Sequence, residues 1–221
     1  MSQLLQEDVE LFRPIFIENL KRFKDEQIIK ILCGVRRCGK STILESYKNE
    51  LLSLGVKSCN IIQRLYTSLE FDSDFDYRKM YHELMILIEN AEKNQKIYLL
   101  LDEVQEVENW EKCINSLFEN QNVDIYVTGS NSKLLSSEIS TYLTGRFVQI
   151  PIFTLSFAEF IEFKNHYFPK NSDNSLDYYF DLYLKTGGFP FLAKTNHSQE
   201  ENYQIVEGIF STVVTRDISK R

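Results

Sequence analysis

The chain has 221 residues, of which 43% are hydrophobic and 26% are charged, an ordinary composition for a globular protein. This composition excludes wholesale disorder and fibrous repeats, and the length suits one large domain or one domain with a small addition. The chain has 25 Lys and Arg residues and 32 Asp and Glu residues. The resulting net charge of −7 does not favour a protein that binds nucleic acid mainly through its phosphates.

Targeting and metal signals are absent from the sequence. No apolar run approaches the roughly 20 residues of a membrane-spanning helix, and residues 1–8 lack the basic and apolar regions of a signal peptide. The 4 cysteines are irregularly spaced without a CxxC pair, so neither a zinc site nor a disulfide framework is indicated. These features predict a cytoplasmic protein that does not contact a membrane.

Strand and helix patterns alternate through the first two thirds of the chain. After a lead-in over residues 1–26, which Pro14 interrupts, short β-branched or apolar runs alternate with segments whose apolar residues recur at helical spacing. The predicted strands are 28–32, 60–69, 97–101, 123–127 and 147–152, and the predicted helices between them are 41–54, 77–88 and 110–118. This order predicts an α/β fold with a mainly parallel sheet covered by helices.

The pattern changes to helices alone after about residue 155. Apolar stripes at helical spacing occur near 157–161, 176–183 and 205–214. We therefore expect an α/β core over residues 1–154 and a small helical subdomain over residues 155–221.

The strongest motif is the glycine-rich segment 34–41, GVRRCGKS, which fits the pattern GxxxxGK[ST] of a P-loop. It follows a predicted buried strand and opens a predicted helix, as such a loop must, because backbone N–H groups and the helix N-terminus then surround phosphate. Lys40 is expected to reach the β- and γ-phosphates, and the Ser41 hydroxyl to ligate Mg²⁺. The residues expected to contact the nucleotide are Gly34, Val35, Arg36, Arg37, Cys38, Gly39, Lys40, Ser41 and Thr42.

A second motif places two acids after the apolar strand 97–101. Ligands of parallel sheets bind at the carboxyl ends of the strands, so Asp102 and Glu103 should meet the P-loop. Asp102 suits a Mg²⁺ ligand, and Glu103 suits a base that polarises the attacking water. The chain has no Asn-Lys-x-Asp segment for reading guanine, and a small-molecule kinase would not need Glu103, so hydrolysis of ATP is the favoured chemistry.

Other residues near the strand ends are weaker candidates. Ser130 and Asn131 follow the strand 123–127, where one of them could hold the attacking water or contact the γ-phosphate. Arg146 is a candidate arginine finger, acting within the chain or on a neighbouring subunit, although a surface ion pair is an equal alternative. Arg36 and Arg37 could contact phosphate, a partner or an acid of this chain.

These segments together resemble the prokaryotic AAA-like and archaeal-type ATPase group. The resemblance includes the GVRRCGKST loop, Leu101-Asp102-Glu103-Val104-Gln105, and Thr128-Gly129-Ser130-Asn131. It continues through Leu143-Thr144-Gly145-Arg146, a Leu-Ser-Phe-Ala-Glu-Phe box at 155–160 in which Thr154 replaces the usual proline, Gly187-Gly188-Phe189-Pro190, and Arg216-Asp217-Ile218.

The resemblance implies an ATPase core that uses ATP and Mg²⁺ and carries an additional catalytic glutamate, with one strand between the P-loop strand and the Asp-Glu strand. It also implies that members continue beyond residue 218, so the helical subdomain is expected to be truncated relative to the family. The alternatives are a nucleotide-dependent switch with little turnover, working on a protein partner or a second copy, and a DNA-associated ATPase.

Overall fold

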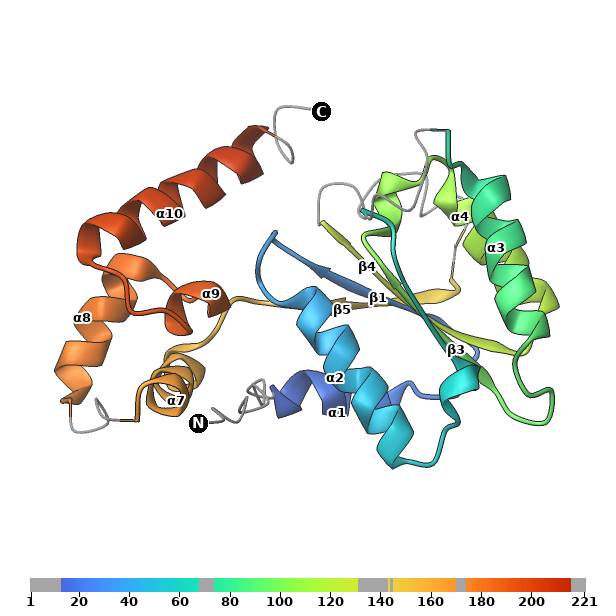
Figure 1. The fold of residues 1–221 in the computed structure, drawn as a ribbon, viewed down its shortest axis with the longest axis horizontal. Coiled ribbons are helices and arrows are strands. Elements are labelled where there is room, and N and C mark those ends of the chain that lie inside the picture. Colours follow the sequence, from blue (N-terminus) through green and yellow to red (C-terminus); the bar gives the residue numbers. More distant parts are fainter. Residues whose placement is uncertain (1–12, 68–73, 131–142, 144, 170–173, 216–221) are drawn as a thin grey trace, which may run out of the picture.

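The computed structural model describes residues 13–67, 74–130, 143, 145–169 and 174–215. Figure 1 shows a sheet with helices on both faces and, to one side of it, a group of further helices. The elements of the sheet and its layers are α1 (Pro14–Arg22), β1 (Ile29–Gly34), α2 (Lys40–Ser53), η1 (Ser58–Asn60), β2 (Ile61–Leu65), α3 (Tyr77–Glu89), β3 (Ile97–Asp102), η2 (Val104–Glu106), α4 (Trp110–Asn120), β4 (Val123–Ser130) and β5 (Phe147–Pro151). The separate group contains α7 (Phe157–Tyr167), α8 (Leu176–Thr186), α9 (Pro190–Ala193) and α10 (Gln199–Val213).

The sheet is parallel throughout, with the strand order β2-β3-β4-β1-β5. β4 lies between β1 and β3, as the family resemblance implied. Gly34 at the end of β1 pairs with Ser130, and Leu101 near the end of β3 pairs with Val127, so the carboxyl ends of these three strands share one edge. Every residue of β1 and β3 is buried, which explains their nearly unbroken apolar runs.

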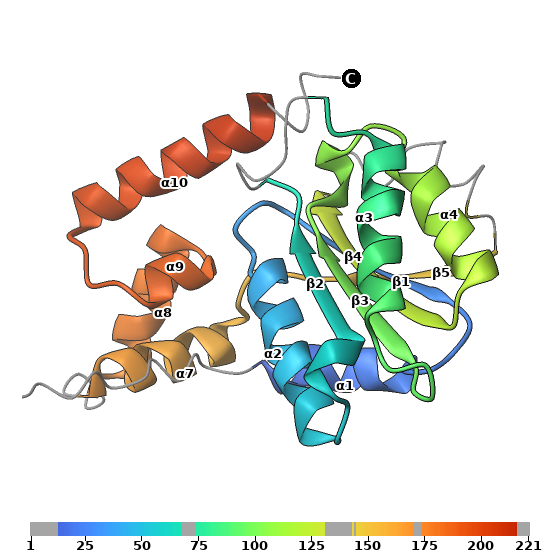
Figure 2. The same ribbon diagram turned by 45° about the vertical axis from the view of Figure 1, so that its right-hand side comes forward.

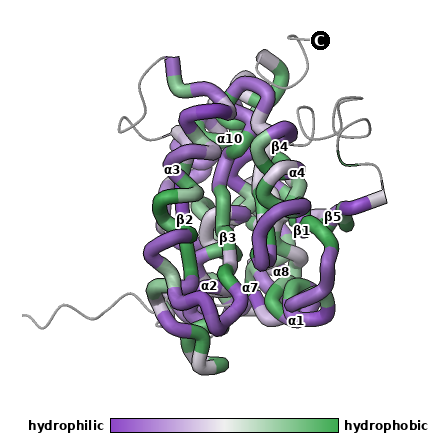
Figure 3. Tube along the Cα trace, turned by 90° about the vertical axis from the view of Figure 1, so that its right-hand side faces the viewer, coloured by the Kyte–Doolittle hydropathy of each residue, from purple (hydrophilic) through white to green (hydrophobic). Residues whose placement is uncertain are grey.

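Two helical layers cover the sheet because successive strand side chains point to opposite faces. On one face, α1 and α2 pack through residues such as Leu20 and Leu44 against Leu32 of β1. On the other face, α3 and α4 pack through Leu84 and the other apolar residues of their inner stripes against strand residues that include Ile31. Figure 2 shows α2 and α3 on opposite sides of the sheet, and Figure 3 shows hydrophobic stretches along the strands.

The group of helices from α7 to α10, for which we keep the name helical subdomain, has a small core made by Leu155, Phe160, Phe163, Tyr179 and Ala193. A capping box begins α7, where Ser156 and Glu159 bond each other's backbone N–H groups, and a second one, Ser198 with Glu201, begins α10. In Figures 1 and 2, α10 runs from the outer part of this subdomain back toward the sheet. Among the described residues, no helix is both long and apolar enough to cross a membrane.

Most predicted elements lie within two residues of their observed bounds, and four differences are larger or change an element's role. Pro14 opens α1 as its first residue instead of interrupting the lead-in, a position where its missing N–H costs nothing. β2 ends at Leu65, and β4 continues to Ser130, past the predicted end at residue 127. The short helix α9, Pro190–Ala193, has no counterpart in the prediction.

Candidate functional site

The loop between β1 and α2 depends on glycine at both ends. A Cβ on Gly34 would lie 2.3 Å from the carbonyl oxygen of Ile152, so no larger residue fits where β1 meets the chain beyond β5. Gly39 is the N-cap of α2 and has a φ of 101°, a backbone conformation that favours glycine. The two glycines therefore let the loop turn sharply and deliver the N-terminus of α2 to the edge of the sheet.

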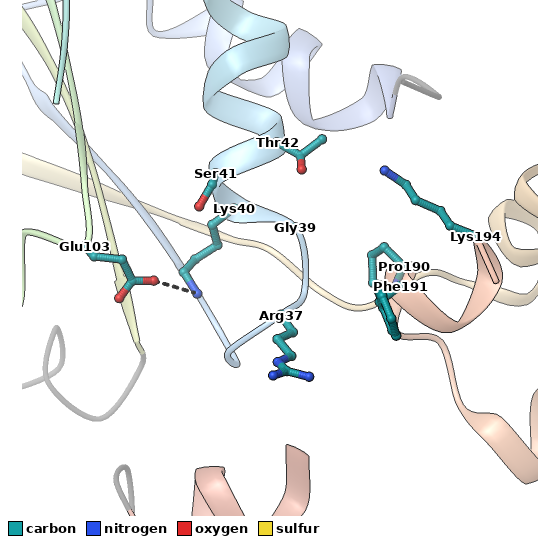
Figure 4. Close-up of a pocket in the computed structure, with 9 residues that line it drawn as sticks. All are labelled: Arg37, Gly39, Lys40, Ser41, Thr42, Glu103, Pro190, Phe191 and Lys194. Atoms are coloured by element: carbon teal, nitrogen blue, oxygen red, sulfur yellow. Dashed lines mark ion pairs between the residues drawn. The ribbon is translucent and has the colours of Figure 1, made fainter. Parts of the chain in front are cut away.

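Lys40 crosses the mouth of this loop. Its side chain is 4% exposed, and its Nζ donates to the carbonyl oxygens of Gly34 at 3.1 Å and Val35 at 3.2 Å. The same Nζ lies 4.0 Å from Oε1 of Glu103, at the end of the neighbouring Asp-Glu segment (Figure 4). Lys40 of the P-loop and Glu103, which follows β3, thus face each other, as we predicted from the carboxyl ends of a parallel sheet.

The other loop residues have distinct surroundings. Ser41 and Thr42, in the first turn of α2, and the exposed Arg37 line the open space beside Lys40. Arg36 instead points to Glu106, with 3.7 Å between Nη2 and Oε1, and Val35 packs at the edge of the α1–α2 core.

The thiol of Cys38 is fully buried in the α1–α2 core, behind the loop. Burial also raises the pKa of this thiol, which disfavours the reactive thiolate. Cys38 can therefore offer a ligand only its backbone.

Thr128 organises the two acids at the end of β3, a role that the sequence analysis missed. Its hydroxyl donates to Oδ1 of Asp102 and accepts the backbone N–H of Glu103 at 3.0 Å. Asp102 is 5% exposed, so the hydrogen bond compensates a carboxylate oxygen that has lost water. The β3–β4 register, in which Leu101 pairs with Val127, is what brings Asp102 beside Thr128.

Glu103 has a strained backbone. Its φ of 54° lies in the left-handed region, which is uncommon for a residue with a side chain. Its carboxylate accepts a hydrogen bond from Nε2 of Gln105 and turns toward Lys40. Such strain persists where the surrounding structure enforces it, and it concentrates at functional sites.

The remaining candidates are not all brought to this edge. Ser130 ends β4 and pairs with Gly34 in the sheet register, whereas Asn131 lies outside the described residues. Arg146 precedes β5 and therefore lies at the amino-terminal edge of the parallel sheet. The length of β1, about 16 Å, separates this edge from the loop. There its guanidinium contacts Glu119 and Asn115 of α4. Of the two alternatives for Arg146, this position favours the surface ion pair over a finger in its own site, because the site and Arg146 occupy opposite edges of the sheet. A finger that acts on a neighbouring subunit stays a prediction.

A cavity of about 530 Å³ lies beside Lys40, and the helical subdomain forms one of its walls. α9 and the residue that follows it contribute Pro190, Phe191 and Lys194, which face the first turn of α2 across the space in Figure 4. Phe191 is 46% exposed. The sequence analysis assigned no ligand contact to these residues, although the Gly187-Gly188-Phe189-Pro190 block marked their position.

The oxygen donors at this edge fit a magnesium ion. Ser41 supplies an exposed hydroxyl, and Asp102 supplies a carboxylate of which Thr128 bonds only Oδ1. The described residues include no group of three or more His, Cys, Asp and Glu side chains that could hold a metal. Mg²⁺ bound with phosphates requires no such group, because one or two protein oxygens, water and the phosphates complete its shell.

Comparison with known proteins agrees with this geometry. A family model described as "AAA domain" matches residues 26–161, which include the loop, both acids and all five strands. The chain belongs to this AAA domain family. An uncharacterized protein of Haemophilus influenzae is 38% identical over 212 residues, which cover 95% of this chain and 50% of the relative. One of Methanocaldococcus jannaschii is 30% identical over 241 residues, covering 96% and 49%. The chain thus spans about half the length of these two relatives.

Solved structures share the fold of this AAA domain. The Walker-type ATPase of Pyrococcus abyssi superposes with a TM-score of 0.62 and 17% identity, over 93% of this chain and 75% of that one. A RuvB variant of Thermotoga maritima gives a TM-score of 0.54 at 16% identity, over 92% and 62%. DnaA of Aquifex aeolicus with bound AMPPCP gives 0.53 at 15% identity, over 90% and 62%. The fold is therefore that of a P-loop NTPase.

Proposed function

We propose that this AAA domain binds ATP with Mg²⁺ and hydrolyses it. The observation that carries the proposal is the convergence of Lys40 and Glu103, 4.0 Å apart, at the mouth of the P-loop. In this chemistry Lys40 would bind phosphate and Glu103 would activate water. The strained backbone of Glu103 holds its carboxylate next to Lys40.

Phosphate binding would use the loop backbone and Lys40. The N-terminus of α2, which begins at Lys40, points its N–H groups and the positive end of its helix dipole toward the edge of the sheet, where phosphate oxygens can bond. Lys40 would exchange its carbonyl partners, Gly34 and Val35, for phosphate oxygens.

Magnesium would be held by the Ser41 hydroxyl and Asp102, whose carboxylate Thr128 orients. When bound, the ion would neutralise charge that develops on the phosphates.

In the hydrolytic step, Glu103 would accept a proton from water as the water oxygen bonds the γ-phosphorus. The bond from the γ-phosphorus to the bridging oxygen breaks, and the products are ADP and inorganic phosphate. Lys40 would stabilise the charge that the leaving oxygen acquires. Phe191 and Lys194 would close the other side of the cavity and keep bulk water away from the reaction.

The test compares wild type with Lys40→Ala and Glu103→Gln, measuring nucleotide affinity by equilibrium binding and phosphate release in parallel. Lys40→Ala should abolish binding, whereas Glu103→Gln should bind normally and lose turnover by at least about a hundredfold, the scale of general-base catalysis. Lys79→Ala and Glu89→Gln, at exposed positions on α3, are the matched controls. Equal turnover in Glu103→Gln and wild type would exclude Glu103 as the base.

A nucleotide-dependent switch is the second candidate, because the cavity has walls from both the core and the helical subdomain. A ligand that touches both walls stabilises one arrangement of the two parts. Tight binding by the wild type without phosphate release would favour this function over hydrolysis. DNA binding is not proposed, since the chain is acidic and no observation on its described residues favours such a ligand.

A further inference from the structure

Arg13 stands just before α1 and is outside the proposed chemistry, yet its side chain is only 6% exposed. All five of its N–H groups find acceptors. Nε and Nη2 bond the two carboxylate oxygens of Glu159 at 2.8 and 3.2 Å. Nη1 bonds the carbonyls of Phe153 at 2.9 Å and Cys38 at 3.4 Å, and Nη2 also bonds that of Thr154 at 3.2 Å.

These acceptors belong to three separate segments. Cys38 is part of the P-loop, residues 153–154 connect the sheet to the helical subdomain, and Glu159 is in the capping box of α7. Arginine is suited to this task, because its planar guanidinium bonds a carboxylate with two parallel N–H groups and keeps the other donors for carbonyls. Glu159 is held as a carboxylate in turn, since Arg13 and the N-cap Ser156 lower its pKa.

The bond to Cys38 bears on the orientation of the phosphate-binding backbone. In a trans peptide the carbonyl and the following N–H point in opposite directions. Because the Cys38 carbonyl points to Arg13, the N–H of Gly39 points away from Arg13, and Gly39 is among the residues that line the cavity.

The segment that connects the sheet to the helical subdomain is also hydrogen-bonded to the chain just before α9, which lines the other side of the cavity. The N–H of Leu155 bonds the carbonyl of Gly188 at 2.6 Å, and the hydroxyl of Tyr183 bonds the carbonyl of Leu155 at 2.9 Å. Gly188 immediately precedes the N-cap of α9, the helix that presents Phe191 to the cavity. Hydrogen bonds and the covalent link between Thr154 and Leu155 thus connect the P-loop, Arg13, the connecting segment and the residue two before the start of α9.

We propose that Arg13 is a positioning residue that holds the P-loop and the helical subdomain in the arrangement that forms a complete nucleotide cavity. For its effect on nucleotide affinity, the inference rests on the proposed function. Arg13 acts through the Cys38 carbonyl on one side and through Glu159 and Gly188 on the other, without touching the nucleotide itself.

The experiment measures two quantities in Arg13→Met, Arg13→Lys and Glu159→Gln. One is nucleotide affinity by equilibrium binding. The other is the position of the helical subdomain by fluorescence energy transfer between dyes on the exposed Cys59 and a cysteine introduced as Lys185→Cys on α8, the remaining cysteines being buried. Arg64→Met, which breaks another Arg–Glu pair, and Glu201→Gln, which removes the charge from the capping box of α10, are the matched controls.

Arg13→Met should weaken nucleotide affinity about tenfold or more, the effect of losing a charge-assisted hydrogen bond, and should change the transfer efficiency without nucleotide. Arg13→Lys should restore part of both quantities, and Glu159→Gln should resemble Arg13→Met, because glutamine keeps the capping box but not the charge. The two controls should leave both quantities unchanged.

The proposal is overturned if Arg13→Met lowers only the unfolding midpoint, while affinity and transfer efficiency match those of Arg64→Met. If Arg13→Met does not fold, Arg13→Lys and Glu159→Gln decide the question by the same two quantities. If the wild type binds no nucleotide, the proposed function fails, and the transfer efficiency alone decides whether Arg13 positions the subdomain.

Discussion

Thr128 shows how one hydroxyl can serve two acids. It donates to the Asp102 carboxylate and accepts the N–H of Glu103, so it fixes both the metal-binding candidate and the strained backbone of the base candidate. The positions of these groups therefore depend on a residue that lies on the neighbouring strand and outside the motif that contains the two acids.

We expect Thr128→Val, which keeps the shape and removes the hydroxyl, to lower ATP turnover by about tenfold or more and stability by about 1–3 kcal/mol. The reason is that a buried carboxylate oxygen and an N–H both lose their partner. Steady-state kinetics and urea unfolding measure the two effects. Thr212→Val, whose hydroxyl bonds a helix carbonyl on α10, is the control. Turnover equal to that of the control would remove Thr128 from the site.

Gly34 limits the space where the loop begins. We expect Gly34→Ala to destabilise the protein by about 1–3 kcal/mol in urea unfolding, because its Cβ would collide with the backbone of Ile152. Gly208→Ala is the contrasting variant. It lies inside α10, and beyond the adjacent backbone of that helix no atom lies within 4 Å of the added Cβ, so alanine should stabilise the helix by up to about 1 kcal/mol. Similar effects at both positions would contradict the steric explanation.

At the scale of the element, α7 and α9 are joined by Lys164. This side chain is 8% exposed, and its Nζ donates to the carbonyls of Leu192 at 3.1 Å and Thr195 at 2.7 Å, at the end of α9. Burial lowers its pKa to about 8. Its acceptors carry only partial charge, so they compensate the desolvation of the ammonium incompletely.

We expect the free energy of unfolding to rise between pH 8 and about 10.5 through Lys164. In this window the unfolded chain holds a proton on Lys164 that the folded chain has released, so raising the pH favours folding, by at most about 3 kcal/mol. Urea unfolding of the wild type and Lys164→Met across this range isolates the effect, because the other titrating groups cancel in the difference. A pH-independent difference would contradict the lowered pKa.

The elements also show what the sequence could predict. The buried runs of β1 and β3 and the spacing of the P-loop predicted the parallel sheet, and the fold confirms it. The short α9 lacked a full helical period, so its pattern carried no signal. The role of Thr128 depends on the register between β3 and β4. The role of Arg13 depends on its contact with Glu159, which lies more than a hundred residues away in the sequence. Hydrophobic periodicity encodes neither. The edge on which Arg146 lies was predictable, because a residue just before a parallel strand lies opposite the carboxyl ends.

At the scale of the whole molecule, the cavity lies between the α/β core and the helical subdomain, so residues of both parts should contribute to nucleotide affinity. A nucleotide that binds only the folded protein stabilises it by about 2.7 kcal/mol at a hundred times its Kd. Lys194, from the helical subdomain, would contribute a positive charge beside the phosphates.

We expect Lys194→Gln to weaken nucleotide affinity by about threefold at low salt and by less at high salt, because Lys194 is partly exposed and ions screen the interaction of charges that solvent reaches. Equilibrium binding at two salt concentrations measures this. Lys185→Gln, on the outer helix α8, is the matched control and should bind as the wild type does. A loss of affinity that does not respond to salt would indicate that Lys194 supports the helix and not the phosphates.

The strand order has a consequence for synthesis on the ribosome. β1 is made before the other four strands of this sheet, but both of its neighbours, β4 and β5, come from residues beyond 122. At typical elongation rates, about 5–20 s separate the emergence of β1 from that of β4. Throughout this interval the apolar residues of β1 have no strand to pair with, so the nascent chain is exposed to misassociation and to chaperones. Nucleotide cannot protect it then, because the last wall of the cavity is translated near residue 194.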